Sequence, residues 1–255
     1  MAIYIGVNGK AKKVKSAYIG NSNNQAVPIY KGSILPSGYL AVSYIYSNSD
    51  DQSLNTGIIP SQYTKSIVVG AIGYYNSAQG SITILNGNGN TNNSYFMILT
   101  RTGTSGSYKY YPYMGCGNNE SSNTDSAIYT PVSSYNTTNI NKFIMTLNKN
   151  TNKQSYYKYN GTEKFVVSNT GGNFTGSQIK LMGNSTQSFI CYCVIYQNIL
   201  NSATPTGEYY PCIKKSTGAA GLWNPYGNNG NGEFLTNSYI VAGPVIENYD
   251  IPNLD

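Results

Sequence analysis

The chain of 255 residues contains no histidine, which removes every catalytic or metal-binding scheme that depends on imidazole. Only 10% of the residues are charged, against about a quarter in an average globular protein. The single arginine, Arg101, argues against nucleic-acid binding and against recognition of phosphate by paired guanidinium contacts. No pair of acidic residues stands out at a spacing typical of glycan hydrolysis, so we predict that the protein is not an enzyme.

Long hydrophobic runs and targeting signals are also missing. The longest apolar run, residues 189–196, is far shorter than the roughly 20 residues that a membrane-spanning helix needs. The chain does not start with a basic segment followed by an apolar core, the pattern typical of a signal peptide. We therefore expect synthesis and assembly in a cytoplasm, with no insertion into a membrane.

Cysteine is scarce, and its spacing favours neither a zinc site nor a disulfide framework. The four cysteines are Cys116, Cys191, Cys193 and Cys212, without the paired CxxC spacings of zinc ligands. Two residues apart on a strand, Cys191 and Cys193 are expected to point to one face, which is an awkward geometry for a mutual bridge. We predict buried, reduced thiols, no metal site and no cofactor.

What the sequence has in abundance is tyrosine, glycine and asparagine, arranged in short β-type segments. Apolar residues alternate with a period of two in residues 3–7, 143–147 and 157–159, while residues 66–73 and 94–99 are short continuous apolar runs. Asn-Gly pairs that suit tight hairpin turns separate these segments. No window of helical length has a 3.6-residue period. The sequence therefore predicts a nearly all-β, antiparallel protein.

The basic residues divide the chain into regions. Five of its 16 basic residues and none of its ten acidic ones lie in residues 1–31, namely Lys10, Lys12, Lys13, Lys15 and Lys31. The same region repeats Tyr-Ile-Gly at residues 4–6 and 18–20 and predicts three short strands, too few to form a core of their own.

We divide the chain into four parts on this basis. Residues 1–32 form an N-terminal β segment for anchoring or oligomerisation, and residues 33–38, with Pro and Gly, form a linker. Residues 39–246 form a β head. Residues 247–255 are expected to be a loose C-terminal tail.

Three stretches of the sequence resemble known families. Residues 5–20, IGVNGKAKKVKSAYIG, are similar to the N-terminal module of tail and fibre proteins of bacteriophages and prophages. Residues 44–60, which end in Thr-Gly-Ile-Ile-Pro, resemble the opening of the LamG or concanavalin A-like jelly rolls of such virion proteins. Residues 195–244 resemble their closing pattern, although Trp223 and Asn224 stand where relatives usually have Tyr and Asp.

The resemblance implies an all-β fold and a place on a virus particle. It implies an N-terminal anchor of short strands followed by a concanavalin A-like antiparallel β-sandwich jelly roll. It also implies a virion protein assembled in the cytoplasm of a host bacterium. Other capsid or tail proteins are then the expected partners of residues 1–32. By analogy with phage fibres, and because the short strands need partner edges, we expect a homotrimer.

The densest aromatic segment is the sequence-level candidate for a ligand site. It contains Tyr108, Tyr110, Tyr111 and Tyr113, with Pro112 interrupting the ladder, and is followed by Asn118 and Asn119. On a strand these tyrosines alternate between two faces, so one pair can pack inward while the other meets solvent. Exposed tyrosine rings with neighbouring amides suit the faces and hydroxyls of sugars. Sheet packing followed by a polar loop is the alternative interpretation.

Two further patterns each allow a functional and a structural interpretation. Lys10, Lys12, Lys13 and Lys15 either dock on an acidic virion surface or protect a strand edge against aggregation. The asparagine-rich segments 86–93 and 228–231 either bind Ca²⁺ through oxygen atoms or fill turns. We favour turns, because calcium sites prefer several carboxylates and few lie near.

Three functions follow from the sequence. The first is a virion fibre or appendage protein whose jelly roll adheres to glycans of the host surface. The second is a capsid decoration protein that binds no ligand, and the third, less favoured, is a polysaccharide depolymerase.

Overall fold

The computed structural model describes the chain in separate segments. These are residues 4–7, 10–13, 16–20, 26–31, 34–49, 52–60, 66–75, 82–87, 95–102, 109–116, 119–122, 141–148, 154–159, 162–168, 178–182, 188–197, 205–247, 249 and 254. Within these segments no helix is long and apolar enough to cross a membrane.

The N-terminal region contains four short strands in two hairpins, where the sequence predicts three strands. Strand β1 (Tyr4–Val7) pairs antiparallel with β2 (Lys10–Lys13), and β3 (Ser16–Gly20) pairs antiparallel with β4 (Ala26–Lys31). Each pair is a two-stranded sheet that shares no strand with the larger sheets described below. The Asn8-Gly9 turn signal lies between β1 and β2, as expected for a hairpin.

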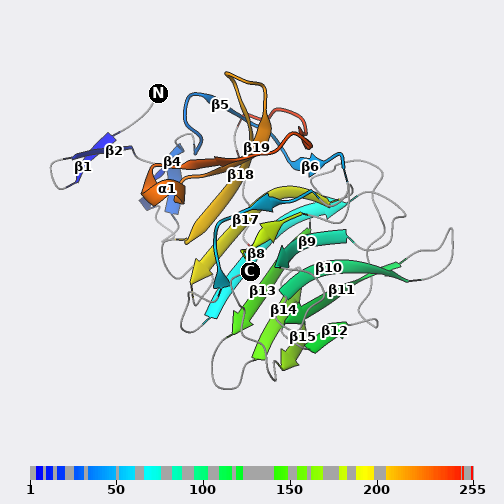
Figure 1. The fold of residues 1–255 in the computed structure, drawn as a ribbon. Coiled ribbons are helices and arrows are strands. Elements are labelled where there is room, and N and C mark those ends of the chain that lie inside the picture. The colour runs from blue at the N-terminus through cyan, green and yellow to red at the C-terminus, as the bar shows by residue number, and fades with distance from the viewer. Residues whose placement is uncertain are drawn as a thin grey trace.

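Two antiparallel sheets form the body, which confirms the all-β, jelly-roll prediction (Figure 1). The smaller sheet has the order β12 (Asn119–Ser122), β11 (Lys109–Cys116), β10 (Tyr95–Thr102), β9 (Ile82–Gly87), β16 (Lys180–Leu181), β7 (Leu54–Asn55). The larger sheet has the order β15 (Thr162–Ser168), β14 (Gln154–Tyr159), β13 (Asn141–Asn148), β8 (Ser66–Tyr75), β17 (Ser188–Gln197), β18 (Gly207–Lys214), β19 (Ala220–Asn224), β20 (Glu233–Leu235).

Three more strands extend the larger sheet, and the chain crosses repeatedly between the two layers. Strand β5 (Tyr39–Ala41) pairs with β18, while β6 (Ile45–Ser47) pairs with both β17 and β21 (Ile240–Ala242). The chain passes from β7 in the smaller sheet to β8 in the larger one, returns for β9 to β12, and crosses again for β13 to β15. These crossings are those of a sandwich rather than of a single meander.

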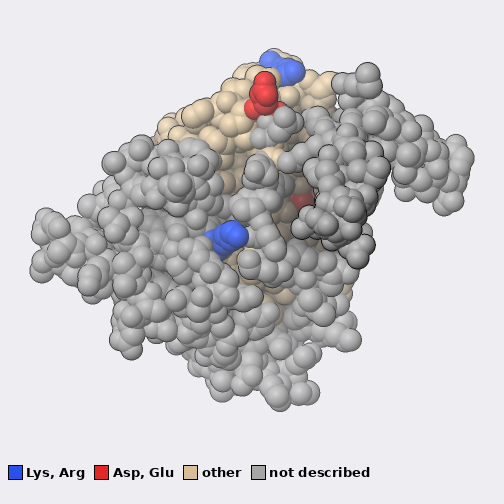
Figure 2. Space-filling model, turned by 180° about the vertical axis from the view of Figure 1, so that it is seen from behind, with Lys and Arg blue, Asp and Glu red and all other residues tan. Residues whose placement is uncertain are grey.

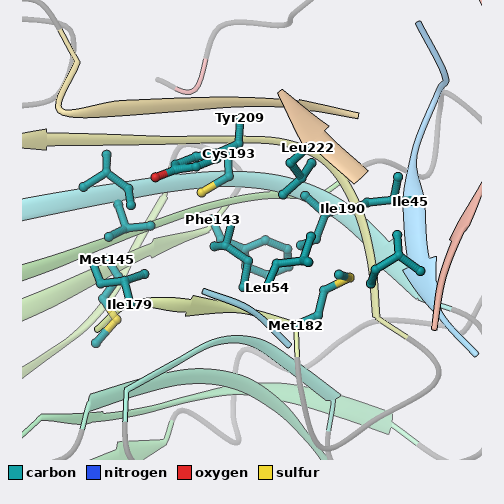
Figure 3. Packing of buried hydrophobic residues seen from close by; sticks show 14 of the residues in the cluster. Ile45, Leu54, Phe143, Met145, Ile179, Met182, Ile190, Cys193, Tyr209 and Leu222 are labelled. Carbon is teal, nitrogen blue, oxygen red and sulfur yellow. The ribbon is translucent and has the colours of Figure 1, made fainter. Parts of the chain in front are cut away.

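The main core lies between the two sheets. It consists of buried side chains from the larger sheet, such as Phe143 and Ile190, packed with Leu54 and Leu181 from the smaller one. Figure 3 shows Phe143 and Ile190 close to Leu54, with Met182 beside them. The β-branched and aromatic residues that favour strands in the sequence therefore fill much of the sandwich, together with Leu and Met side chains.

The Thr-Gly-x-x-Pro motif links two distant parts of the smaller sheet. The Thr56 hydroxyl donates a hydrogen bond to the carbonyl oxygen of Ile179 at 2.7 Å and accepts one from the backbone N–H of Ile58 at 3.2 Å. Gly57 has a φ of +74°, in the left-handed region that glycine adopts readily. The motif thus has a structural role, because it holds residues 56–58 against the segment that leads into β16.

The outer face of the larger sheet carries a second buried cluster, and a bulge in β17 changes which residues reach it. Ile190, Cys193 and Ile195 belong to the inner core, but Cys191 and Tyr192 both belong to the outer cluster. The register of β17 against β8 shifts between Ile190 and Tyr192, which is the signature of a β-bulge. The prediction that Cys191 and Cys193 share a face is therefore wrong.

The structure bears out the prediction of reduced, buried thiols at three cysteines. Cys191, Cys193 and Cys212 are free and buried. Burial raises the pKa of Cys191 and of Cys212 to about 12 and also raises that of Cys193. A thiol with such a pKa is inert at neutral pH. Cys116 lies on β11, and its side chain is outside the described residues.

Both ends of the head are held by apolar anchors on the outer face. Leu35 of the expected linker and Tyr249 and Leu254 of the expected tail are buried in the outer cluster. The prediction of a loose tail is therefore wrong at residues 249 and 254. These apolar side chains bury their surface against the sheet.

Candidate functional site

The structure places the tyrosine segment predicted from the sequence on one strand. Tyr110, Tyr111 and Tyr113 are residues of β11, which runs between β10 and β12, and Asn119 is the first residue of β12. Tyr108 and Asn118 lie outside the described residues, as do the side chains of the other four. The structure thus leaves the predicted sugar-binding role of this segment untested.

Pro112 does not interrupt β11, contrary to the prediction. Residue 112 pairs with Leu99 of β10 within an unbroken register. On the other side, β12 pairs only with residues 113–116 of β11. Proline lacks a backbone N–H and is tolerated where one side of a strand makes no ladder bond, which explains its place here.

The predicted attachment lysines follow the expected strand pattern as far as the structure describes them. Lys10, Lys12 and Lys13 belong to β2, where they pair with Val7, Ile5 and Tyr4 of β1. Lys15 lies outside the described residues, as do the side chains of the other three. The segment is thus one strand of a hairpin, a geometry that both interpretations of the lysines share.

A row of aromatic side chains crosses the outer face of the larger sheet and was not predicted. Phe234 on β20 is the register partner of Trp223 on β19, which in turn is the partner of Tyr210 on β18. The Tyr210 ring contacts the Tyr192 ring of β17, with centroids 5.5 Å apart. Cross-strand partners share a face, so these four residues form a continuous aromatic row.

Other rings flank the aromatic row at both ends. Tyr39 contacts the Trp223 and Phe234 rings, with centroids 5.0 and 5.3 Å apart. Tyr249 of the tail contacts Tyr210 at 5.4 Å. Phe234 and Trp223 are half-buried, whereas Tyr210 and Tyr192 are buried, so the row becomes accessible toward β20.

Glu208 places a carboxylate beside the buried end of the row. The Tyr192 hydroxyl donates a hydrogen bond to Glu208 Oε1 at 2.9 Å, and the Tyr210 hydroxyl also bonds to this carboxylate. Burial, followed by the negative charge of Glu208, raises the pKa of both tyrosines. Both phenols therefore keep their protons and act as hydrogen-bond donors to Glu208.

Two further tyrosines complete what we name the Glu208 cluster: Glu208, Tyr192, Tyr196, Tyr210 and Tyr226. Burial and then the charge of Glu208 raise the pKa of Tyr196, and the nearby Tyr226 contributes to the raised pKa of both Tyr196 and Tyr210. Tyr196 is buried, while Glu208 and Tyr226 are half-buried. One carboxylate is thus lined by phenols and remains partly open to solvent.

Asn224 connects the backbone of two residues of this cluster, Glu208 and Tyr226. Its Oδ1 accepts hydrogen bonds from the backbone N–H of Glu208 at 3.2 Å and of Tyr226 at 3.0 Å. The residue is only 3% exposed, so both bonds are largely shielded from water. Asn224 therefore joins β18 to the loop after β19. Within the described residues, no group of three or more potential ligands can hold a metal.

The loop after β19 presents amides next to the Glu208 cluster. Its single turn, α1 (Gly227–Gly230), has left-handed backbone angles at Asn228 and Asn229, and Asn228, Asn229 and Asn231 are exposed. Asparagine tolerates this conformation, so the turn-filling interpretation of residues 228–231 is confirmed at these two positions. The result is an exposed amide edge that follows directly on Tyr226.

Sequence reasoning missed the Glu208 cluster because its parts are far apart in the chain. Tyr192 and Glu208 come from neighbouring strands, whose pairing aligns Val194 with Glu208 and Cys193 with Tyr209. The available signal was local: Glu208 and Tyr210 are two residues apart, a spacing that places both on one face of a strand.

Figure 2 shows how few charged side chains occupy the described surface on the side opposite to Figure 1.

Comparisons with known proteins identify no family. No family model matches the chain, and no curated protein matches it either. Among solved structures, the CBM40 domain of the Ruminococcus gnavus IT-sialidase, bound to α2,3-sialyllactose, is similar with a TM-score of 0.40 and 15% identity over 67% of this chain and 95% of that one. The potassium-bound carbohydrate recognition domain of Emp46p has a TM-score of 0.39 and 14% identity over 64% and 90%.

A third similar structure is the binding domain of botulinum neurotoxin DC in complex with rat synaptotagmin II. Its TM-score is 0.35, with 16% identity over 73% of this chain and 49% of that one. Two of these three neighbours are carbohydrate-binding domains by their descriptions and the third binds a protein. Identity and TM-score are low in each case, so the ligands named for those proteins belong to those proteins alone.

Proposed function

We propose that this protein is a fibre or appendage protein of a bacteriophage particle, assembled in the host cytoplasm, whose β-sandwich adheres to glycans of the host surface. Residues 1–32 attach it to other virion proteins or to further copies of itself. The observation that carries the proposal is the separation of β1 to β4 from the two large sheets, because their described pairings stay within two hairpins. The segment that resembles phage proteins lies in this same region, as do five lysines without any acidic residue.

The outer face of the larger sheet supports the adhesive role. Sugars bind to proteins through aromatic rings that meet their C–H faces and through polar groups that meet their hydroxyls. The aromatic row supplies rings, while Glu208 and the amides of residues 228–231 supply polar groups at its side. The segment from Tyr108 to Asn119, of which residues 109–116 and 119 lie on the smaller sheet, remains the ligand site that the sequence predicts.

A decoration protein without a ligand is the second candidate, and one observation favours it. A Cβ atom added to Gly232 would overlap the Trp223 ring, and Tyr39 also contacts that ring. Packing within the protein thus uses much of the indole surface. A purely structural role for the aromatic row would account for these contacts equally well.

Deletion of residues 1–32 tests the anchor. We expect the truncated head to stay folded and soluble, with a cooperative melting transition, and to be absent from purified particles. The full chain is expected to be a trimer by light scattering and the truncated head a monomer. Normal incorporation of the truncated head would contradict the proposal.

Replacement of Lys10, Lys12 and Lys13 by Gln separates the two interpretations of the lysines. If the lysines bind an acidic virion surface, the triple variant should remain soluble but be incorporated poorly into particles. Added salt should reduce incorporation of the wild-type protein in the same way. Aggregation of the variant together with normal incorporation of its soluble fraction would instead indicate edge protection.

A further inference from the structure

We infer that the Glu208 cluster binds the ammonium group of a positively charged sugar, such as an amino sugar without an acetyl group. The inference deepens the proposed glycan-binding function and rests on it. It assigns positively charged sugars to the Glu208 cluster, because the cluster carries the negative charge of Glu208.

The first argument is that the charge of Glu208 has no cationic partner within the described structure. The described lysine side chains are Lys142, Lys180, Lys214 and Lys215, and none of them forms an ion pair with Glu208. The carboxylate is nevertheless half-buried between strands. A carboxylate that is partly removed from water is normally paired or heavily hydrogen-bonded. A cation bound beside Glu208 therefore offsets the free-energy cost of desolvating the carboxylate.

The second argument is that the carboxylate keeps room for another donor. An ionised carboxylate offers about four acceptor positions on its two oxygens. The phenols of Tyr192 and Tyr210 occupy two of them. An ammonium group carries three N–H donors and no acceptor, so it complements the positions that remain.

The third argument concerns the lining of the site. Tyrosine rings attract cations through their electron-rich faces, and the effect grows when water is excluded. Tyr192, Tyr196 and Tyr210 are buried around Glu208, and Tyr226 lies near enough to raise the pKa of Tyr196 and Tyr210. A carboxylate lined by phenols discriminates in favour of cations and repels acidic sugars and phosphates.

The test compares two ligands that differ only in the group concerned. The full chain is titrated with a glucosamine trimer and with an N-acetylglucosamine trimer, at a pH where the free amine is protonated. We expect at least tenfold tighter binding of the glucosamine trimer, with a preference that falls as salt is raised. Equal affinities, or no binding of the glucosamine trimer, would overturn the inference without any need for a variant.

Two matched variants locate the effect. Glu208→Gln removes the charge but keeps an oxygen for the tyrosines, and we expect it to lose at least fivefold of the preference for glucosamine. Glu247→Gln removes an exposed carboxylate outside the cluster and should retain the preference. A preference that survives in Glu208→Gln contradicts the inference, provided that both variants melt as the wild type does.

Adhesion to host cells separates failure of this inference from failure of the proposed function. Adhesion that persists in Glu208→Gln and that neither trimer inhibits overturns the ammonium site but leaves glycan binding intact. Absence of any adhesion or glycan binding by the wild-type chain overturns both. Adhesion that glucosamine inhibits and N-acetylglucosamine does not inhibit supports both.

Discussion

Gly232 and Gly230 form a natural pair for testing how the aromatic row is packed. Both have φ values in the left-handed region, +87° and +82°, so an alanine at either position strains the backbone. A Cβ atom at residue 232 would also overlap the Trp223 ring, whereas at residue 230 it would meet nothing within 4 Å.

We therefore expect Gly230→Ala to lower the free energy of unfolding by about 1 kcal/mol and Gly232→Ala by roughly 1–3 kcal/mol more. Urea unfolding followed by the fluorescence of Trp223, the one tryptophan of the chain, measures both variants. Equal losses would show that the indole is not packed against residue 232.

The buried thiols make the stability of the head depend on alkaline pH. Burial raises the folded-state pKa of Cys191 and Cys212 from the ordinary thiol value of 9.0 to about 12, so above pH 9 the unfolded chain loses protons that the folded chain retains. Their stabilising contribution is complete below pH 9 and is lost as the pH rises toward 12.

Each of these thiols should lower the free energy of unfolding by up to about 1.4 kcal/mol per pH unit in that window. Urea unfolding at pH 7, 9 and 10.5 checks the slope. The variant Cys212→Ala, compared with wild type, should be less stable at neutral pH but should lose less on going to pH 10.5. Identical slopes in the two proteins would contradict this assignment.

At the scale of elements, the C-terminal tail behaves as part of the outer layer of the sheet. Tyr249 is 7% exposed and contacts the Tyr210 ring, and Leu254 is 4% exposed in the same cluster. We expect Leu254→Ala to cost about 2–4 kcal/mol of unfolding free energy, because it removes a buried side chain.

Val245→Ala is the matched control, since Val245 is 59% exposed and should change stability by no more than about 0.5 kcal/mol. Thermal melting and urea unfolding of the two variants give the comparison. A Leu254→Ala variant as stable as Val245→Ala would mean that the tail is loose, as the sequence predicts.

The strands could be predicted from the sequence better than their faces. Period-two patterns and Asn-Gly turns identified strands such as β13, because local propensity and burial agree there. The bulge at Cys191 adds one residue that no local pattern marks, and it transfers every later side chain of β17 to the opposite face. The prediction of a loose tail was wrong for a related reason, because its few apolar residues, Tyr249, Ile251 and Leu254, recur with no regular period.

The residues of the candidate site also differ in how well the sequence predicts them. The tyrosines of β11 could be found from density alone, since they are close in sequence. The Glu208 cluster depends on the register between β17 and β18, which long-range packing sets. Asn224 shows the limit most clearly: the sequence shows only an Asn where similar jelly rolls usually have Asp, whereas its role is to accept two backbone hydrogen bonds.

At the scale of the whole molecule, a basic N-terminal segment without acidic residues precedes a β head in which basic and acidic residues nearly balance. Under the proposed function, such a head is displayed in several copies and adheres through contacts that are individually weak, because the copies engage together. The same arrangement requires that the anchor and the head can be separated without loss of either fold. Both requirements concern the complete assembly rather than any one strand.

The most direct test of the central claim is a glycan array probed with the full chain, combined with incubation of the chain on capsule and cell-wall extract of the host. The account predicts specific binding to a subset of glycans, enriched in those with free amino groups, and no release of shortened sugar chains. Absence of binding would contradict it and favour a decoration protein, whereas cleavage of the polysaccharide would contradict it and indicate a depolymerase.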